Sequence, residues 1–122
     1  SNDQIKSIKK KYNKKIIATI TVDKKRDVKK FKEYISSADI ILFDSVGYEK
    51  SISIDKTYLK DLPKDMNFMI AGNLKPHDDF KVLSKKFNFI DISSGVESKK
   101  GIKDKEKINQ FLCNINKTNN ED

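Results

Sequence analysis

The chain has 122 residues, 36% of them hydrophobic, which suffices for one compact core but not for two. Its 26 lysine and arginine residues exceed its 18 acidic residues and give a net charge of +8. No apolar stretch approaches the roughly 20 residues that a membrane span requires, and the first residues lack the apolar core of a signal peptide. A single cysteine, Cys113, excludes an intrachain disulfide and a cysteine-rich metal site. We therefore expect one cytoplasmic domain, 1–122, with no metal and no membrane contact.

The excess positive charge has more than one interpretation. Every basic residue except Arg26 is a lysine, whereas proteins that read bases rely largely on arginine. The lysines are dispersed as pairs along the chain, which favours solvated helix faces over a nucleic-acid surface. Attraction of an anionic small molecule is the lesser alternative. We therefore predict no nucleic-acid partner.

Short apolar runs alternate with amphipathic stretches along the chain, and this alternation predicts repeated β/α units. A helix over 3–12 precedes a strand over 16–22. A second helix, with Asp27 as its N-cap, follows up to about residue 35. The strand over 39–44 contains four consecutive apolar residues, which indicate burial on both faces, as in a parallel sheet covered by helices.

The second half of the chain repeats this pattern. A brief helix over about 55–62 ends at Pro63, and His77 begins the helix that follows the next strand. The predicted elements are strands over 68–71 and 89–92, helices over about 77–86 and 104–116, and a disordered tail over 117–122. Right-handed crossovers make all strands parallel. The pattern permits a small open sheet with helices on both faces, or half of a barrel with helices on the outside only.

Glycine-containing loops follow two neighbouring strands, AGNLKP over 71–76 and DISSGVESKKGIKD over 91–104. Because Gly72 and Gly95 lack a Cβ, an anion can approach the backbone amides there, and Ser93 and Ser94 add hydroxyl donors. Either glycine alone is better explained by a tight turn. The two loops together favour a phosphate-binding site.

Two aspartates belong to apolar strands, Asp44 at the end of one and Asp91 inside the last one. Asp44 follows four apolar residues, and a carboxyl at the rim of a dry interior is desolvated, which favours its protonated form and lets it act as a proton donor. Capping of a loop is an equal alternative for this residue. Asp91 either orients a substrate hydroxyl or remains a buried hydrogen-bond acceptor.

The segments ADIILFDS (38–45), MIAGNLKP (69–76) and FIDISSGVESKKGIKDKEKINQFL (89–112) resemble the last three β/α units of the phosphoribosylanthranilate isomerase family. The SSGVE and GIKD parts of the third segment are the most specific, and the resemblance spans residues 3–116. It implies an α/β fold that is the C-terminal half of a (β/α)8 TIM barrel, with four parallel strands and alternating helices. The strand over 16–22 then corresponds to the fifth strand of the barrel. A complete barrel requires roughly 200 residues or more, so the chain supplies about half of one.

Members of this family perform an Amadori rearrangement in tryptophan biosynthesis, which turns an aminoaldose into an aminoketose without a cofactor. The resemblance therefore implies an isomerase with a phosphorylated small-molecule substrate. It matches Asp44 to the general acid and Asp91 to an acidic position near the sugar. The positions that match the phosphate-binding loops are Gly72, Asn73, Ser93, Ser94 and Gly95. Asn73 stands where the family usually has glycine, so it either supplies or obstructs a backbone amide.

Other parts of the family's active site lie outside the matched segments. These are a cysteine base after the first strand, an arginine on an early loop and a histidine motif after the fourth strand. Cys113 cannot replace the base, because it corresponds to the eighth helix. The family's glycine-rich loop after the sixth strand is shortened here to 45–54, and Lys100 replaces a proline. The resemblance thus implies a fragment that is inactive alone.

A half-barrel exposes two strand edges and an apolar inner face, which water disfavours. We therefore expect a partner, either the missing N-terminal half or a second copy that forms a homodimer. Two other functions stay open. One is a non-catalytic phospholigand-binding α/β module, which would be a self-contained monomer. The other is a basic nucleic-acid binder, which depends only on the net charge.

Overall fold

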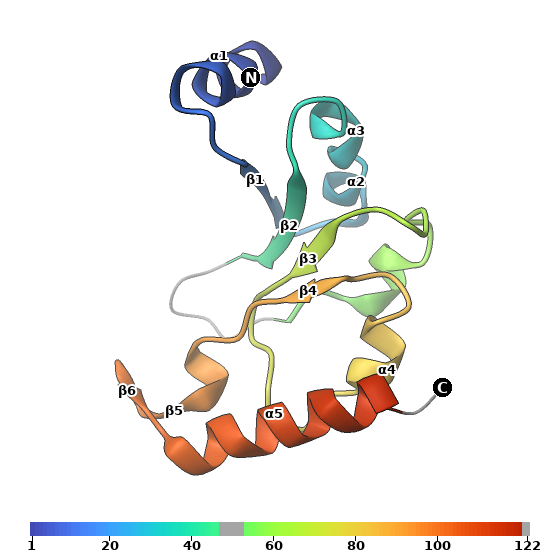
Figure 1. Ribbon diagram of the computed structural model, residues 1–122. Helices are drawn as coiled ribbons and strands as arrows, with labels where there is room; N and C mark the ends of the chain where they lie inside the picture. Colours follow the sequence, from blue (N-terminus) through green and yellow to red (C-terminus); the bar gives the residue numbers. More distant parts are fainter. Residues whose placement is uncertain (47–52, 121–122) are drawn as a thin grey trace.

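The computed structural model describes residues 1–46 and 53–120 (Figure 1). Its elements are α1 (Asn2–Tyr12), β1 (Ile17–Val22), α2 (Lys25–Val28), α3 (Phe31–Tyr34), β2 (Ile40–Ser45), η1 (Lys56–Leu59), β3 (Phe68–Ile70), α4 (Phe80–Leu83), β4 (Phe89–Ile90), η2 (Ser94–Val96), β5 (Glu97–Lys99), β6 (Ile102–Lys103) and α5 (Lys105–Asn120). The elements η1 and η2 are short 3-10 helices. The order confirms an α/β fold in which four parallel strands alternate with helices.

The four parallel strands lie in the order β1-β2-β3-β4, which is also their order along the chain. Phe43 of β2 pairs with Ile70 of β3, and Ile70 pairs with Ile90 of β4. Because the strands are parallel, their C-terminal ends and the loops that follow lie at one edge of the sheet. Part of the shortened loop after β2, residues 47–52, lies outside the described residues.

The hydrophobic core lies on one face of this sheet. Phe43 and Phe68 are fully buried, and their rings meet edge to face with centroids 5.3 Å apart. Phe31 from α3 and Phe80 from α4 join the same cluster. Along β1 the residues alternate strictly between exposed and buried, with Ile20 buried under the helices. This period of two means that the helices cover a single face.

The opposite face of the sheet is covered by none of the described helices. The sequence predicts burial of 39–44 on both faces, but only Ile41 and Phe43 are buried, while Ile40 and Leu42 are half-buried. That prediction is wrong for the chain by itself, because no described helix lies over the second face. Two large apolar side chains at the edges of the sheet remain exposed, Ile17 at 50% and Phe89 at 39%.

The segment after β1 differs from the predicted single helix. It forms two short helices, α2 and α3, and Asp27 is the third residue of α2 and not its N-cap. The Asp27 carboxylate accepts hydrogen bonds from the backbone N–H of Lys24 at 2.9 Å and of Asp23 at 3.1 Å. The bond from Lys24, then that from the Lys30 side chain, lowers the pKa of Asp27 to about 2. Asp27 thus caps the helix from within its first turn.

The helices around β3 are also shorter than predicted. The 3-10 helix η1 spans Lys56–Leu59 only, and α4 spans Phe80–Leu83. Asp79, not His77, begins α4, since its carboxylate accepts a hydrogen bond from the N–H of Val82 at 3.1 Å. A short carboxylate at an N-cap satisfies the free amides of the first turn.

The C-terminal region contains more regular structure than predicted. Residues 97–103 form an antiparallel hairpin, β5–β6, whose turn includes Gly101 at a φ of 81°. Helix α5 continues to Asn120, so 117–120 of the predicted disordered tail are helical, and 121–122 lie outside the described residues. The hydroxyl of Thr118 donates to the carbonyl of Asn114 at 3.0 Å and stabilises this last turn. None of the described helices is both long and apolar enough to cross a membrane.

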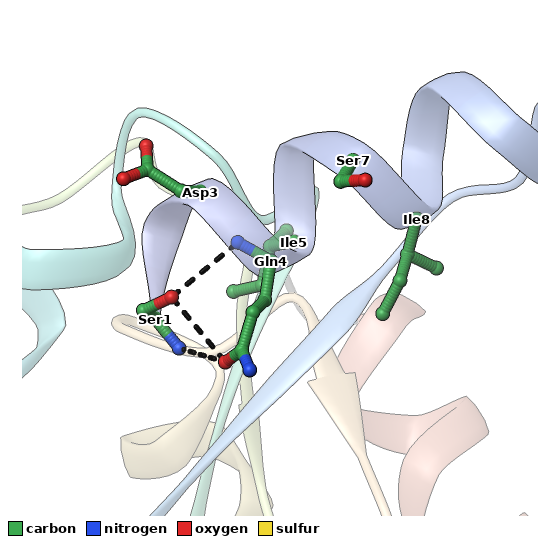
Figure 2. A pocket seen from close by; sticks show the side chains of 6 residues that line it. All are labelled: Ser1, Asp3, Gln4, Ile5, Ser7 and Ile8. Atoms are coloured by element: carbon green, nitrogen blue, oxygen red, sulfur yellow. Dashed lines mark hydrogen bonds between the residues drawn. The ribbon is translucent and has the colours of Figure 1, made fainter.

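Helix α1 lies apart from the strands' C-terminal edge (Figure 1). Lys9 forms an ion pair with Asp39, just before β2, at 3.1 Å. Ser1 and Gln4 form a capping box, as Figure 2 shows, in which the Gln4 N–H donates to Ser1 Oγ at 3.4 Å. The hollow in Figure 2 is lined by Ser1, Asp3, Gln4, Ile5, Ser7 and Ile8. It contains none of the predicted site residues.

Candidate functional site

Asp44 lies near the end of β2 on the uncovered face of the sheet. Successive residues of a strand point to opposite faces, and Phe43 points into the core, so Asp44 points away from the helices. The carboxylate is half-buried, and its Oδ1 accepts a hydrogen bond from the Ser45 N–H at 2.8 Å. Its Oδ2 takes part in no hydrogen bond within residues 1–46 and 53–120. That oxygen is therefore available to a ligand on the open face.

Gly72 directly follows β3 and packs against the end of β2. Its φ of 94° is in the region that favours glycine. A Cβ at this position would lie 2.6 Å from the Ser45 nitrogen and 2.7 Å from the Ser45 Cβ, closer than real atoms approach. The glycine thus serves a tight turn, and it also brings the loop after β3 into contact with the residue next to Asp44.

Gly95 makes the corresponding contact one strand further along the sheet. A Cβ at this position would overlap the carbonyl oxygen of Leu74 and lie 3.0 Å from its carbonyl carbon. Gly95 is buried, whereas Ser93 and Ser94 are exposed. The loop after β4 therefore packs on the loop after β3. Together with the Gly72 contact, this joins the end of β2 and the loops after β3 and β4 into one row.

Three backbone N–H groups in this row have no acceptor among the described residues. The N–H of Val96 donates to the Ser93 carbonyl at 3.3 Å. Those of Gly72, Ser94 and Gly95 donate to no acceptor in the part of the chain that the structure describes. Amides of this kind bind anions well, since an unsatisfied donor gains a partner. The arrangement suits the oxygens of a phosphate group.

Asn73 and Asp91 flank this row of loops. Asn73 has a φ of 52°, and its Nδ2 donates to Ser53 Oγ at 3.0 Å, which ties the loop after β3 to the segment before η1. Asp91 is exposed, so the interpretation as a buried acceptor is wrong. Asp44, Ala71 and Asp91 each follow the last paired residue of their strand, Phe43, Ile70 and Ile90, so they fall in one row across the sheet. The Cα atoms of the two aspartates are then separated by one strand, at roughly 10 Å.

The sequence matches one protein family over almost its whole length. The family model described as N-(5'phosphoribosyl)anthranilate (PRA) isomerase matches residues 1–114. The chain belongs to this family. The PRA isomerase of Rhizobium rhizogenes is 32% identical over 120 residues, which cover 92% of this chain and 54% of that protein. That of Agrobacterium fabrum is 30% identical over 124 residues, which cover 95% of this chain and 56% of that protein. The chain thus spans about half the length of the curated relatives it matches.

Solved PRA isomerases share the fold of this chain. The enzyme from Thermotoga maritima superimposes with a TM-score of 0.70 at 27% identity, covering 91% of this chain and 56% of that one. A second structure, described as monomers of the dimeric T. maritima enzyme, gives a TM-score of 0.66 at 23% identity, covering 93% and 56%. These matches confirm the resemblance seen in the three motif segments.

Two residues of this chain were not singled out from the sequence, although they hold the loop after β4. Lys103 Nζ donates to the carbonyl oxygen and to Oγ of Ser93, both at 3.1 Å, and to Glu97 Oε1 at 2.7 Å. Glu97 and Lys103 are partners in the β5–β6 register. The sequence feature that indicates this hairpin is a pair of opposite charges on either side of Gly101. Hydrophobic periodicity does not detect it, because the segment shows no apolar alternation.

The hairpin is expected to lose stability in acid through Glu97. The hydrogen bond from Lys103, then that from the N–H of Gly101, holds the pKa of Glu97 below its usual value of 4.5. Because the folded-state pKa is lowered, the stabilisation is fully present above the unfolded value and is lost as the pH falls through the folded value. The unfolding midpoint of Glu97→Gln should therefore depend less on pH than that of the wild type as the pH falls below the usual value of 4.5. Equal slopes in thermal unfolding followed by circular dichroism would contradict this role.

Proposed function

We propose that this chain is the part of a phosphoribosylanthranilate isomerase that holds the substrate phosphate and supplies the general acid. The supporting observation is the row formed by the end of β2 and the loops after β3 and β4, in which Gly72 packs on Ser45 and Gly95 packs on Leu74. In the proposed complex the phosphate accepts hydrogen bonds from the amides of Gly72, Ser94 and Gly95 and from the serine hydroxyls. The relatives are named for this activity.

The proposed reaction is the Amadori rearrangement of the aminoaldose phosphoribosylanthranilate. Asp44, in its protonated form, donates its proton to the furanose ring oxygen, and the bond from that oxygen to C1′ breaks as the anthranilate nitrogen forms a double bond to C1′. A base from outside this chain then removes the C2′ proton, and the resulting enol tautomerises to the aminoketose. Asp91, roughly 10 Å from Asp44, is placed to contact a sugar hydroxyl. The proposed steps use no metal and no cofactor.

We further propose that 1–122 is a single domain forming the C-terminal half of a (β/α)8 barrel. Helices on one face of the sheet and coverage of about half of each relative support this architecture. The uncovered face, with Ile17 and Phe89 exposed, would form half of the barrel interior. Its partner is the N-terminal half or, when that half is absent, a second copy of the chain. One T. maritima relative is itself described as dimeric.

The half-barrel proposal predicts that the isolated chain does not stay monomeric. Exposed apolar surface on one sheet face and an unpaired edge at β1 favour association. Sedimentation equilibrium at micromolar concentration should therefore show a dimer or larger species. A stable monomer would contradict the half-barrel and fit a self-contained open sheet.

Joining the chain to a complementary half tests the proposed activity. The match covers 54% of the R. rhizogenes enzyme, and in this proposal the rest of that enzyme serves as the N-terminal half. Turnover of phosphoribosylanthranilate should be negligible for this chain alone and measurable for the joined protein, because two proton-handling groups are needed. A folded joined protein that binds phosphate without turnover would instead support a non-catalytic phospholigand-binding module.

A further inference from the structure

We propose that Lys103 is a positioning residue for phosphate binding, which orients the Ser93 hydroxyl and holds the loop after β4 in its binding form. The inference rests on the proposed function, since it concerns the phosphate site described above. Lys103 comes from β6, outside the loops that line the site, and it reaches back to Ser93 across the hairpin.

All three N–H bonds of the Lys103 ammonium have acceptors within the protein. These are the carbonyl oxygen and Oγ of Ser93, both at 3.1 Å, and Glu97 Oε1 at 2.7 Å. A lysine ammonium has three donors and no acceptor, so none of its hydrogens remains for a ligand. Lys103 therefore acts through Ser93 and does not contact the phosphate.

The bond from Lys103 determines where the Ser93 hydroxyl can donate. A serine hydroxyl has one hydrogen and two acceptor sites, and here Oγ accepts from the ammonium. Within the described ranges the hydroxyl hydrogen has no acceptor. A hydroxyl that accepts from a cation is polarised and becomes a stronger donor. Ser93 is exposed beside the amides of Ser94 and Gly95, so its hydrogen is available to the same phosphate.

Lys103 is itself fixed by Glu97. The side chain of Glu97 is only 16% exposed, and its Oε2 accepts from the Gly101 N–H at 3.1 Å. Lys107 Nζ, from α5, donates to the Glu97 carbonyl at 2.6 Å and anchors the hairpin to the last helix. The carboxylate neutralises the ammonium locally. Lys103 therefore affects phosphate binding by orienting the Ser93 hydroxyl and not by adding positive charge to the site.

Lys99 is a matched control in the same hairpin. It is exposed, and its side chain takes part in none of the hydrogen bonds or ion pairs found within 1–46 and 53–120. Lys99→Met removes the same charge as Lys103→Met, so any general electrostatic effect on an anion appears in both variants.

The test is the affinity of the 122-residue chain for inorganic phosphate, measured by phosphorus NMR titration with the folded state checked by circular dichroism. Lys103→Met should weaken phosphate binding about tenfold, the loss expected for a charge-assisted hydrogen bond. Lys99→Met should stay within about twofold of the wild type. Lys103→Arg should recover most of the affinity, because its guanidinium can donate to the same acceptors. Should Lys103→Met fail to fold, Lys103→Gln takes its place in the same series.

A double-mutant cycle separates positioning from a general structural role. If Lys103 acts through the Ser93 hydroxyl, Ser93→Ala weakens binding by a similar factor, and the double variant binds no more weakly than either single one. Losses that multiply, or a Lys103→Met variant that binds like Lys99→Met, would overturn the inference and leave the proposed function intact. A wild-type chain that does not bind phosphate would overturn both.

Discussion

Asp44→Asn is expected to lower the isomerase turnover of the completed barrel by roughly 10²- to 10⁴-fold, the usual contribution of a general acid. The amide has almost the shape of the carboxylic acid but cannot give up a proton to the ring oxygen. Its oxygen can still accept the hydrogen bond from the Ser45 N–H, which is 2.8 Å long for the aspartate, so the fold should persist. The phosphate loops are untouched, and the loss should appear in kcat with little change in KM.

Asp61→Asn provides the control for the loss of one carboxylate. Asp61 is highly exposed, and its ion pair with Lys25, at 3.5 Å, lies on the surface, where such pairs contribute little. This variant should keep the turnover of the parent. Full activity in Asp44→Asn would reject Asp44 as the acid, and a parallel fall in thermal stability would indicate a structural role instead.

Gly95→Ala should both destabilise the chain and abolish most phosphate binding. The new Cβ would overlap the Leu74 carbonyl oxygen, a backbone atom that cannot move aside as a flexible side chain does. Overpacking of this kind costs about 1–3 kcal/mol of unfolding free energy. Because the loop after β4 must move away from the loop after β3, the two sets of amides no longer converge. Phosphate affinity should fall at least about tenfold.

The matched substitution for Gly95→Ala is Ser98→Ala in β5, an exposed position with no hydrogen bond found in the described ranges. It should leave both the unfolding free energy and the phosphate affinity close to those of the wild type. Denaturant unfolding and phosphate titration check the pair of variants. A folded Gly95→Ala chain with unchanged affinity would show that the two loops do not share a ligand.

The four parallel strands and the two terminal helices were predicted closely from the sequence, whereas the short helices between the strands and the β5–β6 hairpin were not. The strand expected over 16–22 is found at Ile17–Val22, because alternate burial under the helices preserves its apolar pattern. The helix expected over 77–86 is reduced to Phe80–Leu83, because tertiary packing of short crossover segments overrides local periodicity. Periodicity also left two architectures open. Which face the helices cover depends on the path of the crossovers, which no local pattern encodes.

The sequence predicts which residues form the candidate site, but not which contacts these residues make. The sequence identifies Gly72 and Gly95 as positions where a missing Cβ matters. It does not predict that Gly72 contacts Ser45 or that Gly95 contacts the Leu74 carbonyl, because these contacts depend on strand register and loop path. The Lys103 contact to Ser93 was missed for a related reason. The hairpin that creates it is held by charged side chains and a glycine turn, and such segments carry no apolar signature.

The central claim is that the amides of Gly72, Ser94 and Gly95 bind one phosphate group on the edge of the sheet beside Asp44. Titration of the nitrogen-15-labelled chain with ribose 5-phosphate, followed by amide NMR shifts, tests it most directly, with ribose as the control. We predict that these three amides shift together along one saturating curve with ribose 5-phosphate and do not shift with ribose. Shifts that leave these amides unchanged, or that appear only on exposed lysine segments such as α1, would contradict the account.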